Sequence, residues 1–420
     1  MLKKISFCGL SHLGLVYSSV YSNFSKKIVC FDENIELIGN LNKKQIDIDE
    51  PGLTKQIRKN FHKFKFTNDI KQIEKSDLIF LSLDVPTNKN GKSDYHKIFE
   101  IIKKLKKSKL NKTPIIILSQ LFPGFCDKIS KEFKNEIYYQ VETLVFGEAL
   151  SRAKKPERII VGSKNKKIEN KSFEYLLSKF KCPKINMDFM TAEMTKISIN
   201  ILLISTAMTS NYLSILSEKI GFDWSQIAES LRLDKRIGKF SYLSPSLGLA
   251  GGNLERDLYS LQKVTKQMNL NISIIDSWKK ISDIKKKWIT NILNNLLKNN
   301  NKTPISLLGL SYKENTNSIK NSNSIYTSQN FIKNYFLAFD PLVKSHQIKN
   351  LKNIKIEKID LCLKKSTIII ISNSSKYFFE YFKKKYPLLK NKIVIDPYDV
   401  LKDIEKLNVQ KRYIMGKKDA

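Results

Sequence analysis

Short apolar runs alternate with amphipathic patterns along the first third of the chain. The first apolar run is followed by the helical pattern "LGLVYSSVYSNF". The later runs are separated by lysine-rich segments with helical spacing. Repeated strand and helix signals of this kind are typical of a parallel, doubly wound sheet, so we expect a first domain over residues 1–188. The expected strands are "KISFCG", "KIVCFD", "DLIFLSLDVP", "TPIIILSQ", "IYYQVE" and "RIIVGS".

The pattern changes near Met190, where strand signals stop and long helical patterns begin. The stretch "TAEMTKISINILLISTAMTSNYLSILSEKIG" predicts one helix of about thirty residues that ends at Gly221. Strand signals return after "NNNKTP" with "ISLLGLS", "FLAFDP", "TIIIISN" and "KIVIDPY". The predicted fold class is α/β, with two Rossmann-like doubly wound sheet domains joined by a long-helix central domain. We place the central domain at 189–300 and the last domain at 301–420.

The net charge of +34 raises the question of an anionic partner. The lysines are spread along every segment, and no nucleic-acid-binding motif accompanies them. This distribution favours a compositional bias, so we expect no nucleic-acid partner. The charge would still concentrate an anionic substrate near the surface.

Cysteine and hydropathy patterns favour a cytoplasmic protein. The five cysteines show no CxxC spacing and the chain has only four histidines, so we expect reduced thiols and no metal site. The apolar N-terminal run has the pattern of a strand, a turn and a helix, which we prefer to a signal peptide. The best candidate for a membrane span, Ile197 to Leu216, is interrupted by Ser, Thr and Asn. We therefore expect no membrane insertion.

A dinucleotide motif lies between the first expected strand and helix. "GLSHLG" spans Gly9 to Gly14, and Asp32 ends the next expected strand. In this context Gly9 would make the tight turn, Gly14 would let the helix pack on the strand, and Asp32 would bind ribose hydroxyls. A carboxylate there favours NAD over NADP. The middle glycine of the motif is replaced by Ser11, at the point where the backbone would come closest to the phosphate.

Eight motifs, in order along the chain, resemble those of the UDP-glucose/GDP-mannose dehydrogenases. The similarity runs from Lys3 to about Leu407. The motifs are "DEPGL" (49–53), "DVPTNKNGKSD" (84–94), "KPERIIVG" (155–162), "TAEMTKISIN" (191–200), "LDKRIG" (233–238), "GLAGGNLERD" (248–257), "LLGLSYKENT" (307–316) and "IDPYDVL" (395–401). The resemblance implies an NAD-binding domain, a helical dimerisation core and a nucleotide-sugar-binding domain.

The resemblance also implies a reaction. Such enzymes oxidise the C6 alcohol of a nucleotide sugar to a carboxylate with two molecules of NAD. A cysteine thiolate captures the intermediate aldehyde as a thiohemiacetal, which can donate a second hydride, and water then releases the acid from a thioester.

Residues carried over from the family's motifs give a candidate catalytic set. Lys196 and Asn200 match the residues that hold the reacting oxygen and its water, and they lie one helical turn apart. Asp257 matches the aspartate that helps to activate this water, and Glu142 matches the catalytic glutamate. The other expected contacts are, for the substrate, Arg236 from a neighbouring subunit, Tyr242, Gly248, Gly251 and Lys313, and for the cofactor, Gly9, Ser11, Leu13, Gly14, Asp32, Thr87, Gln120 and Lys320.

Several family positions have changed in this chain. Asn253 stands where the family has its catalytic cysteine, and no other cysteine aligns close to that position. The remaining changes are Arg256 for a lysine, Gln120 for a threonine, Phe146 for a second glutamate, and Lys320 and Tyr398 for arginines.

Two functions remain open at this point. An amide cannot form a thiohemiacetal, but a single hydride transfer needs only NAD, a proton acceptor and donors to the developing alkoxide. We therefore favour an NAD-dependent nucleotide-sugar dehydrogenase with an altered outcome, acting on a UDP-sugar and forming a homodimer through its central helices. The alternative is a catalytically inactive relative that binds NAD or a nucleotide sugar. The sequence does not identify the sugar.

Overall fold

The computed structural model describes residues 1–87, 93–110, 112–298 and 304–418. The chain divides into two compact units, Met1–Ile199 and Asn200–Ala420. Residues 88–92 of the motif "DVPTNKNGKSD" lie outside the described residues. The predicted boundary between the central and the last domain, at residues 300 and 301, also lies outside the described residues.

The first unit is built on an eight-stranded sheet in the order β3-β2-β1-β4-β5-β6-β7-β8. Its strands are β1 (Leu2–Cys8), β2 (Ser25–Phe31), β3 (Phe64–Thr67), β4 (Leu78–Leu81), β5 (Ile115–Ile117), β6 (Ile137–Gln140), β7 (Ile159–Ser163) and β8 (Lys184–Met187). Its helices are α1 (His12–Tyr21), α2 (Ile35–Asn42), α3 (Leu53–Lys59), α4 (His96–Lys107), α5 (Phe125–Ser130), α6 (Ala149–Lys154) and α7 (Lys171–Leu177). Short 3₁₀ turns are η1 (Phe61–Lys63) and η2 (Ile70–Ile73).

Alternate strand residues supply two cores, one on each face of this sheet. Phe80 of β4 belongs to the core beneath α1, α6 and α7, whereas its neighbours Ile79 and Leu81 belong to the core beneath α4 and α5. Successive strand side chains point to opposite faces, so a strand covered on both sides must be apolar throughout. All four residues of β4 are buried.

One expectation for this sheet is wrong, because β7 pairs antiparallel with β6. The helix between these strands, α6, has six residues and rises only about 9 Å. The loop before α6 is bonded through the backbone N–H of Gly147 to the Glu50 carboxylate at the carboxyl end of the sheet. The chain therefore does not cross back before β7 begins, and β7 runs in the opposite direction.

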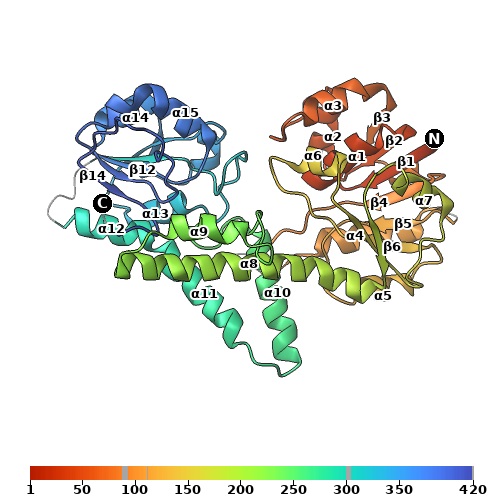
Figure 1. Cartoon of the computed structure of the whole chain (residues 1–420). Helices are drawn as coiled ribbons and strands as arrows, with labels where there is room; N and C mark the ends of the chain where they lie inside the picture. Colours follow the sequence, from red (N-terminus) through yellow and green to blue (C-terminus); the bar gives the residue numbers. More distant parts are fainter. Residues whose placement is uncertain (88–92, 111, 299–303, 419–420) are drawn as a thin grey trace. The chain divides into compact units, whose positions relative to one another are not determined.

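The second unit contains a six-stranded, wholly parallel sheet in the order β11-β10-β9-β12-β13-β14. Helices α14 and α15 cover one face, and α12 and α13 cover the other (Figure 1). The strands are β9 (Ile305–Leu308), β10 (Phe336–Phe339), β11 (Ile354–Ile356), β12 (Ile368–Ile371), β13 (Ile393–Ile395) and β14 (Lys411–Tyr413). The helices are α12 (Trp288–Leu296), α13 (Asn323–Asn330), α14 (Ile359–Lys365) and α15 (Lys376–Lys385), with 3₁₀ turns η3 (Ser345–Ile348) and η4 (Tyr386–Leu389).

The long helix α8 (Phe189–Ile220) ends at Gly221, as the sequence predicts. Gly221 has φ +100°, the left-handed conformation that terminates many helices. By length and composition α8 is apolar enough to cross a membrane, with 39% of its most apolar window buried. One such helix is weak evidence for a span, and the absence of membrane insertion stays a prediction.

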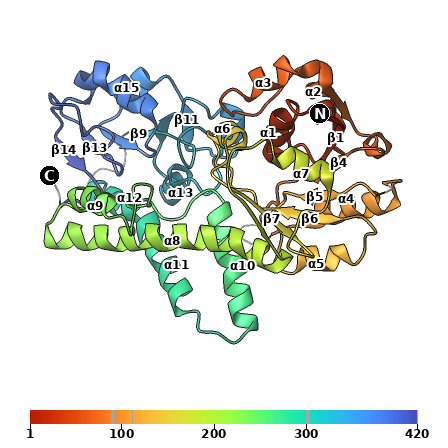
Figure 2. The same cartoon turned by 45° about the vertical axis from the view of Figure 1, so that its right-hand side comes forward.

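The second unit also holds α9 (Trp224–Leu233) and the helical hairpin of α10 (Asn253–Gln267) and α11 (Ser273–Lys286), seen in both views (Figures 1 and 2).

Candidate active site

The turn after β1 has both glycines in the steric roles that the motif predicts. Gly9 has φ +97°, and a Cβ on it would lie 2.5 Å from Cγ of Leu83. A Cβ on Gly14 would lie far inside contact distance of the Gly9 carbonyl oxygen. A side chain at Gly9 would therefore displace Leu83, and a side chain at Gly14 would separate α1 from the turn after β1.

Ser11 and Asp32 brace this turn through hydrogen bonds. The Ser11 hydroxyl donates to the Ser82 carbonyl (3.1 Å) and accepts from the Asp84 N–H (3.1 Å), so the serine ties the turn to the segment after β4. The Asp32 carboxylate accepts from the N–H of Leu10 (2.8 Å) and of Asn34 (3.0 Å).

A cavity of about 570 Å³ opens beside this turn. Ser11 and Asp32 line it, and so does Val85 after β4. Helix α1 begins here with no acidic residue in its first turn, which suits an anionic group. The size, the tight glycines and the half-buried carboxylate fit the adenosine and pyrophosphate of a dinucleotide.

Three further residues expected at the cofactor lie in different surroundings. Thr87, beyond Val85, forms an isolated bridge with Ser93. Gln120 is half-buried after β5. The side chain of Leu13 lies in the core of the unit, so only its backbone could reach a phosphate.

Two candidate catalytic residues form an ion pair in the first unit. Lys196 Nζ lies 3.7 Å from Glu142 Oε2, with the two side chains 10% and 18% exposed. Glu142 follows β6 and also accepts a hydrogen bond from the N–H of Leu144. A half-buried pair of this kind can hold and pass a proton.

Two more candidate catalytic residues, Asn200 and Asp257, form a buried pair in the second unit. Asn200 of α8 donates an amide hydrogen bond to Asp257 of α10, and Asp257 also lies 3.3 Å from Nε of Arg256. Asp257 is fully buried, and Arg256 and Asn200 are almost so. Asn253, predicted from the sequence to stand at the family's cysteine position, is the exposed first residue of α10, one turn before Asp257.

The loop before α10 is tightly packed at its glycines. A Cβ on Gly248 (φ +80°) would lie 2.5 Å from the Ser282 carbonyl, and one on Gly251 (φ +85°) would lie 2.8 Å from the Tyr312 ring. A Cβ on Gly252 would lie 3.0 Å from Lys320 Nζ. The loop, Lys320 and Tyr312 therefore meet next to Asn253.

The other expected substrate contacts flank this loop or point to solvent. Lys313 Nζ stands 5.9 Å from the centre of the Tyr312 ring. Burial raises the pKa of Tyr312 to about 12, with a smaller contribution from nearby Tyr242. Arg236 is 88% exposed and paired with Asp234, so the structure does not bring it together with the other site residues of its own unit.

A second glycine turn repeats the geometry of the first in the C-terminal sheet. Gly309, after β9, has φ +93°, and its N–H donates to Phe339 as that of Gly9 does to Phe31. Asp340 accepts from the N–H groups of Leu310 (2.7 Å) and Ser311 (3.0 Å), as Asp32 accepts from that of Leu10. Each unit thus has the turn that nucleotide-binding sheets use.

Comparison with known proteins assigns three segments to one family. Residues 3–181 match the NAD binding domain, residues 190–283 the central domain and residues 306–403 the UDP binding domain of the UDP-glucose/GDP-mannose dehydrogenases. The chain belongs to the UDP-glucose/GDP-mannose dehydrogenase family. It is an oxidoreductase similar to UDP-glucose 6-dehydrogenases, and NAD is its cofactor.

Relatives cover almost the full chain. UDP-glucose 6-dehydrogenase of Rickettsia bellii is 27% identical over 97% of this chain and 98% of its own length. The corresponding enzyme of Rickettsia prowazekii is 26% identical over 94% and 95%. The fold is that of a UDP-glucose dehydrogenase from Pyrobaculum islandicum (TM-score 0.86, 19% identity, 98% and 97% covered) and of a UDP-D-ManNAc dehydrogenase from Pyrococcus horikoshii (0.83, 17%, 99% and 100%).

Against this family background, Cys8, Cys30, Cys126 and Cys362 are each held in a hydrophobic core of their own unit. Cys362 is the one cysteine in the second unit's sequence, and it lies in the core beneath α14, where burial raises its pKa to about 12. Cys8, Cys30 and Cys126 are buried in the first unit, where burial raises the pKa of each thiol. Among the described residues no group of three His, Cys, Asp or Glu side chains is arranged to hold a metal ion.

Sequence reasoning missed two buried acids that hold loops of the first unit, the unit that contains the NAD binding domain. Glu193 of α8 accepts from the N–H groups of Gly124 (2.6 Å) and Cys126 (2.8 Å), which fixes the segment after Gln120. Glu50 holds the loop after β6. Both lie in the motifs "TAEMTKISIN" and "DEPGL", but their backbone partners are distant in sequence.

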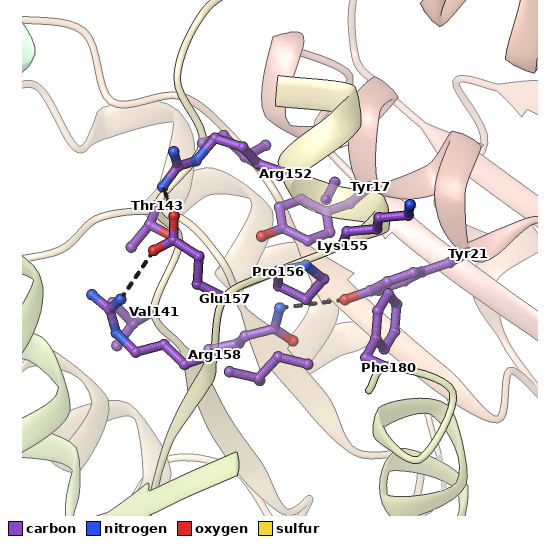
Figure 3. Close-up of a pocket in the computed structure, with 14 residues that line it drawn as sticks. Tyr17, Tyr21, Val141, Thr143, Arg152, Lys155, Pro156, Glu157, Arg158 and Phe180 are labelled. Atoms are coloured by element: carbon purple, nitrogen blue, oxygen red, sulfur yellow. Dashed lines mark hydrogen bonds and ion pairs between the residues drawn. The ribbon is translucent and has the colours of Figure 1, made fainter. Parts of the chain in front are cut away.

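A smaller cavity of about 40 Å³ is lined by Tyr17 and Tyr21 and by Val141 and Thr143, the residues on either side of Glu142 in sequence (Figure 3). Gln140 lines it and donates to the Tyr21 hydroxyl at 3.3 Å. Within the described part of the chain, Oε1 of Gln140 and Nε of Arg152 are buried without a hydrogen-bond partner. This volume suits water molecules and is too small for a nucleotide, which leaves the larger cavity beside Ser11 as the candidate cofactor site.

Proposed function

We propose that this family member oxidises a hydroxyl group of a nucleotide sugar by hydride transfer to NAD, without the thiohemiacetal and thioester route. The observation that carries the proposal is Asn253 at the start of α10. It stands one helical turn before Asp257, which is hydrogen-bonded to Asn200. An amide cannot add to an aldehyde as a thiolate does. Cys362, the one cysteine in the second unit's sequence, is held in a hydrophobic core with a raised pKa.

The residues that remain are sufficient for one oxidation. The step R–CH₂OH + NAD⁺ → R–CHO + NADH + H⁺ breaks one C–H and one O–H bond, and NAD accepts the hydride. The Lys196–Glu142 pair, 3.7 Å apart, provides a proton acceptor and a positive charge for the developing alkoxide. Asn200, held by Asp257, adds an amide from the next turn of α8. Oxidation through an aldehyde hydrate, with Glu142 as base, is the variant that would reach the acid.

A UDP-sugar or related nucleotide sugar is the proposed substrate. The match to the family's UDP binding domain and the Gly309–Asp340 turn support a nucleotide in the C-terminal sheet. Relatives named UDP-glucose 6-dehydrogenase support UDP-glucose as the first candidate to test. Lys313, beside the ring of Tyr312, is the proposed cationic contact.

A cytoplasmic homodimer through the central helices is the proposed assembly. Apolar side chains are exposed at Leu202 (68%) and Tyr212 (57%) of α8 and at Phe240 (89%) in the segment before α10. A second copy that covers these side chains would remove them from water. It would also give Arg236, 88% exposed, a site to reach in the neighbouring subunit.

A catalytically inactive relative is the second candidate, because Asn253 removes the one group that the full four-electron route requires. The discriminating experiment measures NADH formed per nucleotide sugar consumed, by absorbance, across a panel led by UDP-glucose, with the mass of the product. One equivalent and a carbonyl product support the proposal. Two equivalents and a uronic acid overturn the single-hydride route, whereas binding of NAD and UDP-sugar without turnover supports the inactive relative.

A further inference from the structure

The carboxylate of Glu50 is enclosed by three donors. His12 Nε2 lies 2.9 Å from Glu50 Oε2, and because a carboxylate only accepts, the histidine donates. The N–H of Gly147 donates to the same oxygen (2.9 Å) and that of Leu150 to the other (3.2 Å). The Glu50 side chain is 1% exposed, so these donors replace water around a buried acid.

His12 belongs to the cofactor turn and reaches away from it. It is the first residue of α1, next to Ser11, within the motif Gly9–Gly14. Its ring packs against the ring of Phe146, with the centroids 4.4 Å apart. One side chain therefore contacts both Glu50 and the middle of the loop after β6.

That loop, taken with the first residue of α6, spans residues 141–149 and carries Glu142 as its second residue. Glu50 bonds it at Gly147, which has φ +87°, and bonds the first turn of α6 at Leu150. At its other end Glu142 pairs with Lys196. Hydrogen bonds and a ring contact thus join the turn at Gly9–Gly14 to residues 146–150, and the backbone of the loop continues from there to Glu142.

We propose that His12 is a positioning residue that couples the cofactor turn to the Glu142 loop, so that an anionic pyrophosphate bound at the start of α1 orders residues 141–149. Binding there restrains the first turn of α1 and hence the side chain of His12, which restrains Glu50 and the N–H groups that Glu50 holds. By linkage, order in the loop strengthens cofactor binding by the same factor. The proposal rests on NAD binding at this turn and not on the altered chemistry at Asn253.

Hydrogen exchange of the full-length protein, with and without NAD⁺, tests the coupling. In the wild type we expect NAD⁺ to slow exchange in peptides covering 9–14 and 141–150. In His12→Phe, which keeps a ring against Phe146 but lacks the donor, protection of 9–14 persists while that of 141–150 falls about tenfold. His12→Gln keeps an N–H donor and restores much of the protection. His62→Phe, at an exposed histidine, is the matched control and leaves both segments unchanged.

NAD affinity gives an independent measurement. Titration calorimetry with NAD⁺ should give a Kd about three- to tenfold weaker for His12→Phe, with partial recovery in His12→Gln. If His12→Phe does not fold, Glu50→Gln, which removes the negative charge and retains an acceptor, should show the same loss of NAD-dependent protection.

Equal NAD-dependent protection of 141–150 in folded His12→Phe and wild type would overturn the proposal. Protection confined to 9–14 in the wild type would overturn it as well. A failure of the proposed oxidation is distinguishable, because it changes the NADH stoichiometry and leaves these binding measurements as predicted.

Discussion

Asn200 donates a hydrogen bond to the fully buried carboxylate of Asp257, and this bond joins α8 to α10 inside the second unit. Four residues before Asp257, at the start of the same helix, stands Asn253. The Asn200–Asp257 bond is therefore present one helical turn from the proposed cysteine position, beside the changes expected at Asn253 and Arg256. The predictions below separate what the framework does from what the missing thiol did.

Asn253→Cys should restore the family's second oxidation. A thiol at the first position of α10 lies at the positive end of the helix, and Lys320 lies beside the preceding Gly252. Both lower a thiol pKa and so favour the nucleophilic thiolate. We expect NADH per UDP-sugar to rise from one to two equivalents, with an acid as product by mass spectrometry. Asn253→Ser, of similar size but without a thiol, should stay at one.

Asn200→Ala should destabilise the second unit by about 1–3 kcal/mol, because the buried Asp257 carboxylate loses a donor. All three tryptophans of the chain, Trp224, Trp278 and Trp288, belong to this unit, so urea unfolding followed by tryptophan fluorescence reports on it. Asn291→Ala, at an exposed asparagine of α12, should change stability by less than about 0.7 kcal/mol. Equal effects of the two variants would contradict a structural role for the Asn200–Asp257 bond.

Glu193 should make the protein less stable as pH rises. Burial raises the pKa of this carboxyl above its usual 4.5, against the smaller opposing effect of the N–H groups of Cys126 and Gly124. The folded state then binds more protons than the unfolded state between 4.5 and the raised pKa, so the free energy of unfolding falls with rising pH in that window. Relative to the wild type, Glu193→Gln should remove this fall. Calorimetric melting from pH 4 to 8 checks it, with the exposed Glu174→Gln as control.

Two glycines with opposite surroundings give a matched pair of alanine substitutions. A Cβ at Gly14 would overlap the Gly9 carbonyl, so Gly14→Ala should cost about 1–3 kcal/mol and abolish detectable NAD⁺ binding. A Cβ at Gly39, within α2, meets nothing within 4 Å, so Gly39→Ala should stabilise the protein by about 0.5–1 kcal/mol. Thermal melting and calorimetric titration with NAD⁺ measure both. Unimpaired NAD⁺ binding by Gly14→Ala would place the cofactor elsewhere.

Local patterns were enough to predict most of the framework. Apolar runs such as "LIFL" marked strands, and Gly221 marked the end of α8, because both signals depend on residues close in sequence. The antiparallel direction of β7 was not predicted, because the direction of a strand depends on the end of the sheet at which the preceding loop is held. That anchor, Glu50, acts on Gly147, almost a hundred residues later.

The sequence by itself determined the order of elements and the dinucleotide turn with Gly9, Gly14 and Asp32. Each of these is a property of residue type at a fixed spacing along the chain. Only the tertiary structure decided which buried acids hold which backbone segments, as Glu50 and Glu193 do, and that Cys362 lies in a core. Those relations depend on burial and on partners brought together by the sheet, and no local pattern records them.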